Sequence, residues 1–393
     1  MDLRLHRGRF AGVVCVLVSY LIAGCDGGGG GGGADRPVPP VTANVASMDA
    51  IGDSISKGFN AVSDQGSCPE SEVESRNFST GDTHGMNLCN DGGEGVFSHA
   101  ERLECIQNKQ IVRADPNSAL SGARMLTEFA DESSASAAFL AGQPAPRYVT
   151  ILLGDNDICA GTVDRVQTAC PHGADEDPQN HCRTTPAAFE RELRRGLDTL
   201  IAVPSLRIGV AALARASLLC ERTGKGICAP GIGGLGLGSC QDLWHTAIAT
   251  NVPDERGICG SLTDDCSDQR VASAYQMAKA YRDILATVSA EYKAVAEGAK
   301  SAGGATKAPG VEVVFSDAVW RTQIVDEDVS CCDCFHPSIQ GQDRLARALM
   351  EGITCGNQDV CCLDTGDPVL DGRCAVEDRS GTFQPGFFPR SGP

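Results

Sequence analysis

The stretch MDAIGDSISKGF, residues 48–59, joins an apolar run to a Gly-Asp-Ser turn and then to a polar segment. The apolar run predicts a buried strand, and the polar segment could open a helix. Ser54 therefore lies where a strand ends, at the carboxyl edge of a parallel sheet, which is where α/β folds bind their ligands. A serine in this position is either a helix N-cap or a nucleophile, and the rest of the chain must decide which.

Other apolar runs predict the remainder of the sheet. Four runs rich in Val, Ile and Leu have the pattern of buried strands: residues 45–52, 147–154, 206–213 and 311–317. Between them, residues 186–203 and about 268–298 carry apolar side chains every three or four positions, which predicts helices. Strands separated by helical crossovers indicate an α/β fold with a mostly parallel sheet.

The first 24 residues have the features of a secretory signal. Three arginines precede a short apolar run, Phe10 to Ile22, which is too short to span a bilayer comfortably. The run ends in LIAGC, which resembles a bacterial lipobox and implies cleavage before Cys25 and acylation of its thiol. An ordinary signal peptide or a short anchor is the alternative. Residues 25–44 contain seven consecutive glycines and then a Pro-rich stretch, as expected of a tether.

The cysteine content also indicates export. The chain has 20 cysteines. Once Cys15 leaves with the signal and Cys25 carries lipid, an even number remains, and behind a signal peptide these cysteines indicate disulfides. The expected location is extracytoplasmic, with the protein held to a bacterial membrane by its lipid.

The chain is predicted to divide into four parts. They are a signal peptide (1–24), a tether (25–44), a catalytic domain (45–350) and a cysteine-rich tail (351–393). Within the domain, three polar cysteine-bearing insertions are predicted as long loops stapled by disulfides: residues 62–105, 158–182 and 220–266. The tail has too little apolar content to build a core of its own.

The net charge excludes one class of partner. The formal net charge is −18 at pH 7, and no basic cluster interrupts the acidic chain. An acidic body repels nucleic acid and anionic lipid surfaces. No nucleic acid is therefore expected as a partner, and contact with the membrane is expected through the lipid on Cys25.

A base for Ser54 is found near the end of the chain. Serine is a weak nucleophile and needs a base. Among the histidines that follow the signal, only His336 has a carboxylate at a useful spacing and follows a predicted strand. In CCDCFHPS, Asp333 precedes His336 by three residues, so one turn could bring its carboxylate to the imidazole. Such a carboxylate fixes the tautomer and leaves the other ring nitrogen free to accept a serine proton.

The same segment allows a metal-binding interpretation. Thiolates of Cys331, Cys332 and Cys334 together with His336 are ligands that zinc accepts. Adjacent cysteines cannot easily share one tetrahedral site, and an exported protein favours disulfides. The prediction is a stapled loop that contains no metal and holds His336 in place.

Two further stretches supply donors for an oxyanion. NSALSGA (117–123) places Gly122 in a tight polar turn, and ILLGDND (151–157) is a strand that ends in Gly-Asp-Asn-Asp. Acyl transfer needs hydrogen-bond donors aimed at the developing negative charge. The backbone N–H groups of Ser54 and Gly122 and the side-chain amide of Asn156 could provide them. Neighbouring Asp53 and Asp157 are predicted to brace the turns as structural groups.

Four blocks in this order, GDSIS, SGA, GDND and DCFH, resemble the SGNH or GDSL hydrolase family over roughly residues 45–350. The resemblance implies a three-layer α/β/α, flavodoxin-like fold and ester hydrolysis through a serine acyl-enzyme, with no cofactor. It makes Ser54 the nucleophile, His336 the base and acid, and Asp333 the residue that orients His336. It also implies that Gly122 and Asn156 form the oxyanion hole with the Ser54 amide.

The sequence departs from the family pattern at two places. Asp155 occupies the variable position beside Asn156, and it is expected to point away from the oxyanion hole because neighbours on an extended segment face opposite sides. The loop around His336 is unusually rich in cysteine.

Within the family, DCFHPS, GDNDIC and RNFSTGD (76–82) are most similar to the phospholipase B branch. This likeness favours lipid or phospholipid acyl esters as substrates of an esterase or lipase. A carbohydrate deacetylase or an acyltransferase would use the same residues. A surface binding lipoprotein on an inactive esterase scaffold is the non-enzymatic alternative, and four intact blocks argue against it.

Overall fold

The computed structural model describes residues 45–62, 68, 71–82, 95–159, 183–222, 224–227, 238–249, 259, 263, 266–298 and 307–354. They all belong to one compact unit. The predicted signal segment, Cys25 with its predicted lipid, the predicted tether, residues 160–182 of the second predicted insertion and the tail from residue 355 onward lie outside the described residues.

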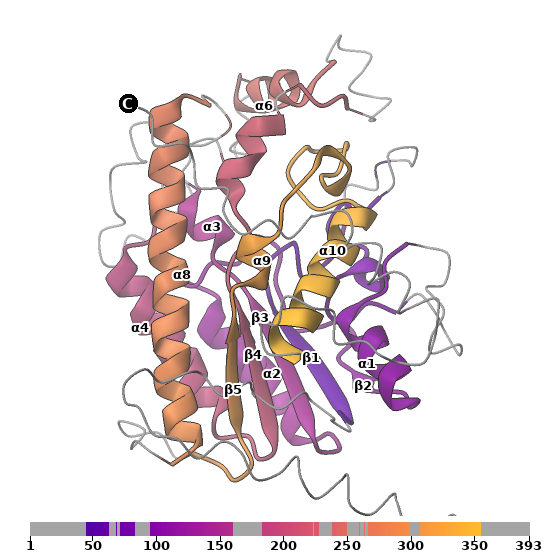
Figure 1. Cartoon of the computed structure of the whole chain (residues 1–393), viewed down its shortest axis with the longest axis vertical. Helices are drawn as coiled ribbons and strands as arrows, with labels where there is room; N and C mark the ends of the chain where they lie inside the picture. The colour runs from indigo at the N-terminus through magenta and orange to yellow at the C-terminus, as the bar shows by residue number, and fades with distance from the viewer. Residues whose placement is uncertain are drawn as a thin grey trace, which may run out of the picture. The chain divides into compact units, whose positions relative to one another are not determined.

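A five-stranded parallel sheet organises this unit, with strand order β2-β1-β3-β4-β5 (Figure 1). The strands are β1 (Ser47–Gly52), β2 (Val112–Arg113), β3 (Arg147–Leu152), β4 (Leu206–Ala211) and β5 (Glu312–Ser316). The four predicted strands correspond to β1, β3, β4 and β5. The sequence analysis missed β2, because two residues at a sheet edge leave no apolar run to detect.

Helices cover both faces of the sheet, which confirms the three-layer α/β/α fold. One layer contains α2 (Phe129–Ala141), α4 (Pro186–Leu200) and α8 (Asp268–Ala296), and the other contains α1 (His99–Gln107) and α10 (Ile339–Leu349). Shorter elements complete the unit: α3 (Asp155–Ile158), α6 (Cys240–Ala249), α9 (Ala318–Arg321), the 3-10 helices η1 (Glu74–Arg76), η4 (Ala216–Arg222) and η5 (Asp326–Asp328), and the π-helix η6 (Met350–Thr354). Both helices predicted from periodicity, α4 and α8, are present.

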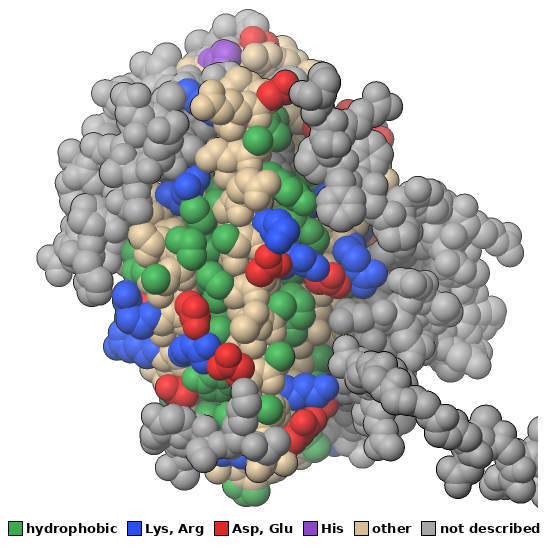
Figure 2. All heavy atoms as spheres, turned by 60° about the vertical axis from the view of Figure 1, so that its left-hand side comes forward, with side chains coloured by type: hydrophobic (Ala, Val, Ile, Leu, Met, Phe, Trp, Pro, Cys, Tyr) green, Lys and Arg blue, Asp and Glu red, His purple; other side chains and the backbone are tan. Residues whose placement is uncertain are grey.

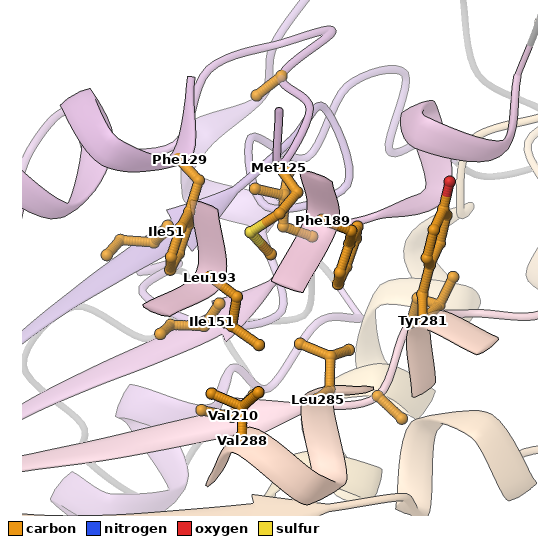
Figure 3. Packing of buried hydrophobic residues seen from close by; sticks show 14 of the residues in the cluster. Ile51, Met125, Phe129, Ile151, Phe189, Leu193, Val210, Tyr281, Leu285 and Val288 are labelled. Atoms are coloured by element: carbon orange, nitrogen blue, oxygen red, sulfur yellow. The ribbon is translucent and has the colours of Figure 1, made fainter. Parts of the chain in front are cut away.

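The alternation of side chains along the strands produces two cores. Val149 and Ile151 of β3 face the α2, α4 and α8 layer, whereas Tyr148 and Leu152 face the α1 and α10 layer. The larger core includes the residues labelled in Figure 3. In it the rings of Phe189 and Tyr281 stack with their centroids 4.2 Å apart, which ties α4 to α8.

Two expectations about irregular segments were wrong. The stretches 62–105 and 220–266 are not loops throughout, because α1 begins within the first and α6 lies within the second. Helix α1 starts at a capping box in which Ser98 and Glu101 bond each other's backbone, a signal present in the sequence. The segment after Ser54 is not a regular helix but a series of turns up to Asn60.

The disulfides predicted from the cysteine count are present in the described part of the chain. Four of them join Cys68 to Cys332, Cys159 to Cys259, Cys220 to Cys266 and Cys240 to Cys334. Each links segments that are distant in sequence, with separations from 46 to 264 residues.

The outer face of the α2, α4 and α8 layer mixes both signs of charge (Figure 2). Arg194 on α4 pairs with Glu291 on α8 at 2.8 Å, and Arg282 on α8 pairs with Asp317 at 2.9 Å. Among the described residues, no helix combines the length and the apolar character needed to cross a bilayer.

Candidate active site

Three predicted side chains meet at the carboxyl edge of the sheet. The Oγ atom of Ser54 lies 2.7 Å from Nε2 of His336, and Nδ1 of the same ring lies 2.7 Å from Oδ2 of Asp333. Ser54 comes from the turn after β1, and the other two come from the loop that precedes α10. The Ser54 hydroxyl is therefore directed at an imidazole, which is the arrangement of a nucleophile with its base.

Both carboxylate oxygens of Asp333 take part in hydrogen bonds. Oδ1 accepts the backbone N–H groups of Phe335 and His336, at 2.9 and 3.0 Å. Oδ2 accepts the side-chain amide of Asn60 at 2.6 Å in addition to its bond with the imidazole. Burial alone would raise the pKa of Asp333, but the charge of His336 and the hydrogen bonds from His336 and Asn60 lower that pKa below its usual value. The carboxylate thus stays ionised beside the imidazole.

Disulfides fix the segment 330–338, here called the His336 loop. Cys332 is bonded to Cys68 and Cys334 to Cys240. The indole N–H of Trp244, on α6, donates to the carbonyl of Asp333 at 3.3 Å. Cys331 is also disulfide-bonded. All three cysteines of the loop are oxidised, so none of them is a thiolate ligand for zinc.

The segment 117–125, here called the oxyanion loop after the role predicted for Gly122, packs against the turn that carries Ser54. The N–H of Leu120 donates to the Gly52 carbonyl at 3.0 Å, and the Asn117 amide donates to the Ser56 carbonyl at 2.9 Å. Gly122 has a φ of +82°, and a Cβ atom on it would meet nothing within 4 Å, so its backbone borders open space. Within the described residues, the backbone N–H groups of Ser54 and Gly122 donate to no protein acceptor. The Asn156 amide donates to the Ala123 carbonyl at 3.0 Å, which places Asn156 against the same loop.

A GDSL-like lipase/acylhydrolase family model matches residues 50–349, a range that contains both loops and every residue of this constellation. The chain belongs to that family. No curated protein matches it. As a member of the GDSL-like family the protein is a hydrolase, and in broad terms an ester hydrolase. The family match and the parallel sheet with helices on both faces agree with the predicted three-layer fold.

In this GDSL-family protein, buried carboxyl groups hold the oxyanion loop. Oδ2 of Asp49 accepts the Ser118 hydroxyl at 2.6 Å, and Oε1 of Glu132 accepts the backbone N–H of Leu120 at 3.0 Å. Oδ2 of Asp157 accepts the backbone N–H of Met125 at 2.7 Å. Three acids from β1, α2 and α3 thus reach one loop, which none of the disulfides in the described residues touches.

Burial raises the pKa of these acids. It raises the pKa of Glu132 to about 9, with a further contribution from the nearby charge of Asp53. Burial likewise raises the pKa of Asp53 and that of Asp157 to about 6. Oδ1 of Asp53 accepts the N–H of Ile55 at 2.9 Å and so braces the turn that presents Ser54.

Asp155 does not lie on an extended segment, so the reason given for its orientation was wrong. It begins the short helix α3, and both of its carboxyl oxygens are buried. Burial, with the charges of Asp53 and Asp157 nearby, raises the pKa of Asp155 well above its usual value. A hydrogen bond from the backbone of Ala214 lowers the pKa of Asp155 and offsets this rise only in part.

The sequence analysis missed Asn60 and Phe59. Asn60 is buried and has a φ of 51°, the left-handed conformation that asparagine tolerates better than most residues. The ring of Phe59 lies 4.7 Å from that of His336. Asn60 and Asp333 are 273 residues apart in the chain, so no local pattern in GFN could have connected them.

Proposed function

We propose that this protein is an exported serine esterase or lipase that forms an acyl-enzyme on Ser54. The observation that carries the proposal is the row of two 2.7 Å hydrogen bonds from Ser54 through His336 to Asp333. It lies beside two backbone N–H groups that no protein atom uses among the described residues. The same geometry supports catalysis over a passive binding role, because a non-catalytic site needs no aligned base.

In the first half of the reaction, Nε2 of His336 accepts the Ser54 proton while Oγ attacks the ester carbonyl carbon. The tetrahedral intermediate collapses when the imidazolium gives that proton to the leaving alkoxide, and the acyl group remains on Ser54. Water then repeats the cycle, with His336 again as base and then as acid. Asp333 stays ionised throughout and stabilises the imidazolium.

The negative oxygen of the intermediate accepts hydrogen bonds from the backbone N–H groups of Ser54 and Gly122 and from the side-chain amide of Asn156. A side-chain amide has two N–H donors. One of them is used on the Ala123 carbonyl, so the other can reach the oxyanion without releasing the loop. Donors already in position cost no reorganisation when the charge develops, which is why such sites accelerate acyl transfer.

The proposed substrate is a lipid or phospholipid acyl ester, as the phospholipase B likeness of the loop blocks favours. Disulfides such as the four that join described residues to one another suit an oxidising compartment outside the cytoplasm. Acylation of Cys25 would place the enzyme at a membrane. Carbohydrate deacetylation and acyl transfer would use the same residues and are distinguished by the substrate assay.

Hydrolysis of a p-nitrophenyl ester series from acetate to palmitate tests the proposal on the oxidised protein. Ser54→Ala and His336→Ala are each expected to lower kcat by about 10⁴–10⁶-fold, the range found when members of a triad are removed. Turnover near that of the wild type in either variant would contradict the triad. A preference for acetate alone would favour the deacetylase, and a preference for longer chains the lipase.

A further inference from the structure

The residues that follow the turn bearing Ser54 contact every member of the proposed triad. The backbone N–H of Phe59 donates to the Ser54 carbonyl at 3.0 Å. The ring of Phe59 lies against the ring of His336, with 4.7 Å between the two centroids. Asn60 donates its amide to the carboxylate of Asp333 at 2.6 Å. One short stretch of chain thus connects the serine to groups that come from the far end of the domain.

Backbone contacts fix this stretch in place. The N–H of Asn60 donates to the Ser71 carbonyl at 3.1 Å, and the Gly58 carbonyl accepts the N–H of Val73 at 3.2 Å. Gly58 has a φ of +64°, and a Cβ atom on it would lie 2.6 Å from the Val73 carbonyl oxygen, so only glycine permits this approach. Phe59 lies between these two anchored residues, and its backbone is therefore fixed relative to the triad.

The imidazole of His336 has two aromatic neighbours. The ring of Phe335 lies 5.2 Å away at an interplanar angle of 75°, and its closeness follows from its place next to His336 in the chain. The ring of Phe59 comes from a remote segment and is nearer, at 4.7 Å, with a tilt of 47°. The His336 side chain is only 12% exposed, so these rings form much of its surroundings. Ring pairs at such separations attract each other beyond the effect of burial.

The protonated imidazole gains more from the Phe59 contact than the neutral imidazole does. The face of an aromatic ring is negative and attracts a cation that lies within about 6 Å of its centroid. In the proposed reaction, His336 becomes an imidazolium each time a tetrahedral intermediate forms. A contact that strengthens as this charge develops lowers the barrier, because it stabilises the transition state more than the ground state.

Two carboxyl groups also act on the charge of His336. Oδ2 of Asp333 lies 2.7 Å from its Nδ1 atom. Asp53 comes from the turn after β1; burial raises its pKa, and the charge of His336 lowers it. A change confined to the electron density of the Phe59 ring leaves both acids in place. Such a change therefore separates the contribution of the ring from the contributions of the acids.

We propose that Phe59 is a positioning residue whose aromatic face stabilises the imidazolium form of His336 during catalysis. The assignment rests on the ester hydrolysis proposed above. No bond forms or breaks at Phe59, and the proton still passes from Ser54 through His336 to the leaving alkoxide. The ring changes only the energy of the charged intermediate, which an aliphatic side chain in the same place would not do.

Replacement of Phe59 by 4-fluoro-, 3,5-difluoro- and 3,4,5-trifluorophenylalanine tests the proposal on the full oxidised protein. Fluorine withdraws electron density from the face of the ring and hardly changes its shape. A less stable imidazolium loses its proton at lower pH. The acid limb of kcat/KM for the best p-nitrophenyl ester should therefore move stepwise to lower pH, by about half a pH unit over the series. The value of kcat should fall in the same order.

The matched control is the same series at Phe139, a half-buried residue of α2, where fluorination should change neither the pH profile nor kcat. Phe59→Leu, which keeps an apolar side chain without an aromatic face, should lower kcat by about threefold, equivalent to the shift of half a pH unit, with little change in KM. A pH profile that stays in place through the whole Phe59 series would overturn the proposal.

Failure of the proposed function gives a different result, because His336 can be titrated without a substrate. NMR follows the imidazole C–H resonance that is absent from His336→Gln and gives the pH midpoint of its titration. If the wild type hydrolyses no ester, a midpoint that falls with fluorination of Phe59 would support the contact and count against the reaction alone. If the wild type is active and neither the midpoint nor the rate responds to fluorination, the role of Phe59 is overturned and the triad stands.

Discussion

The His336 loop and the oxyanion loop flank the same serine but are held by different kinds of interaction. The disulfides at Cys331, Cys332 and Cys334 and the Asn60 amide fix the first. The second is fixed by hydrogen bonds from its backbone and Ser118 to the buried acids Asp49, Glu132 and Asp157. The imidazole of His336 thus sits on a covalent frame, whereas the donors proposed for the oxyanion hole depend on carboxyl groups whose pKa values are shifted.

Because of this difference, the two halves of the site should respond to different treatments, one to a reducing agent and the other to alkaline pH. A reducing agent acts on the His336 loop and leaves the bonds of the oxyanion loop in place. Alkaline pH acts on the oxyanion loop, because Glu132 beneath it has a pKa of about 9 and ionises there. It leaves disulfides in place over the time of an assay. Four changes test this division, in order of the effect expected.

Asn156→Ala removes a donor from the oxyanion side. We expect kcat to fall by about 10²–10³-fold, the usual cost of losing one oxyanion donor. KM should change little, because the amide acts on the charge that develops during the reaction. A loss below about threefold, measured with the best p-nitrophenyl ester, would remove Asn156 from this role.

Removal of one disulfide tests the part of the site that contains His336. In Cys240→Ala/Cys334→Ala the His336 loop can shift, and a displacement of about 1 Å can cost 10²-fold in rate. The matched control is Cys220→Ala/Cys266→Ala, which removes a disulfide outside the loop and should retain most activity. Dithiothreitol should likewise inactivate the wild type before circular dichroism detects unfolding. Full activity in reduced protein would contradict the role of the staples.

Asn60→Gly deletes the amide on Asp333 and retains a residue that adopts a φ of 51° without strain. The carboxylate then loses a stabilising hydrogen bond and becomes more basic, so it holds the proton on His336 more strongly. We expect about 10-fold lower kcat, the order of one hydrogen bond to a charged group, and an acid limb of the kcat/KM profile that moves to higher pH. A lower rate with an unchanged pH profile would indicate a structural role only.

Glu132→Gln tests the acid under the oxyanion loop. Burial raises the pKa of Glu132 from 4.5 to about 9, so the stability it contributes is complete below pH 4.5 and is lost as pH rises toward 9. Glutamine keeps the acceptor for Leu120 and cannot ionise. At pH 8 its Tm should exceed that of the wild type by roughly 2–5 °C, and the gap should close near pH 4.5. A difference in Tm between Glu132→Gln and the wild type that stays the same from pH 4.5 to pH 8 would contradict the shifted pKa of Glu132.

The local sequence determined most of the fold and the residues that are proposed to react. Four strands follow from short apolar runs, and the helices α4 and α8 follow from periodicity. Each of these elements buries its apolar residues against a neighbouring layer of the fold. The blocks around Ser54, Gly122, Asn156 and His336 were recognisable because each combines a turn with chemically specific side chains. The short edge strand β2 and the helix α6 gave no comparable periodic signal.

Tertiary structure decided what depends on contact between distant segments. The 2.6 Å bond from Asn60 to Asp333, the pairing of Cys240 with Cys334 and the contact between the rings of Phe59 and His336 each join residues that lie far apart in the chain. Sequence spacing carries no information about such contacts, because their geometry is set by how the strands order and the helices pack. The shifted pKa values have the same origin, since a carboxyl group loses its solvation only when remote parts of the chain close over it.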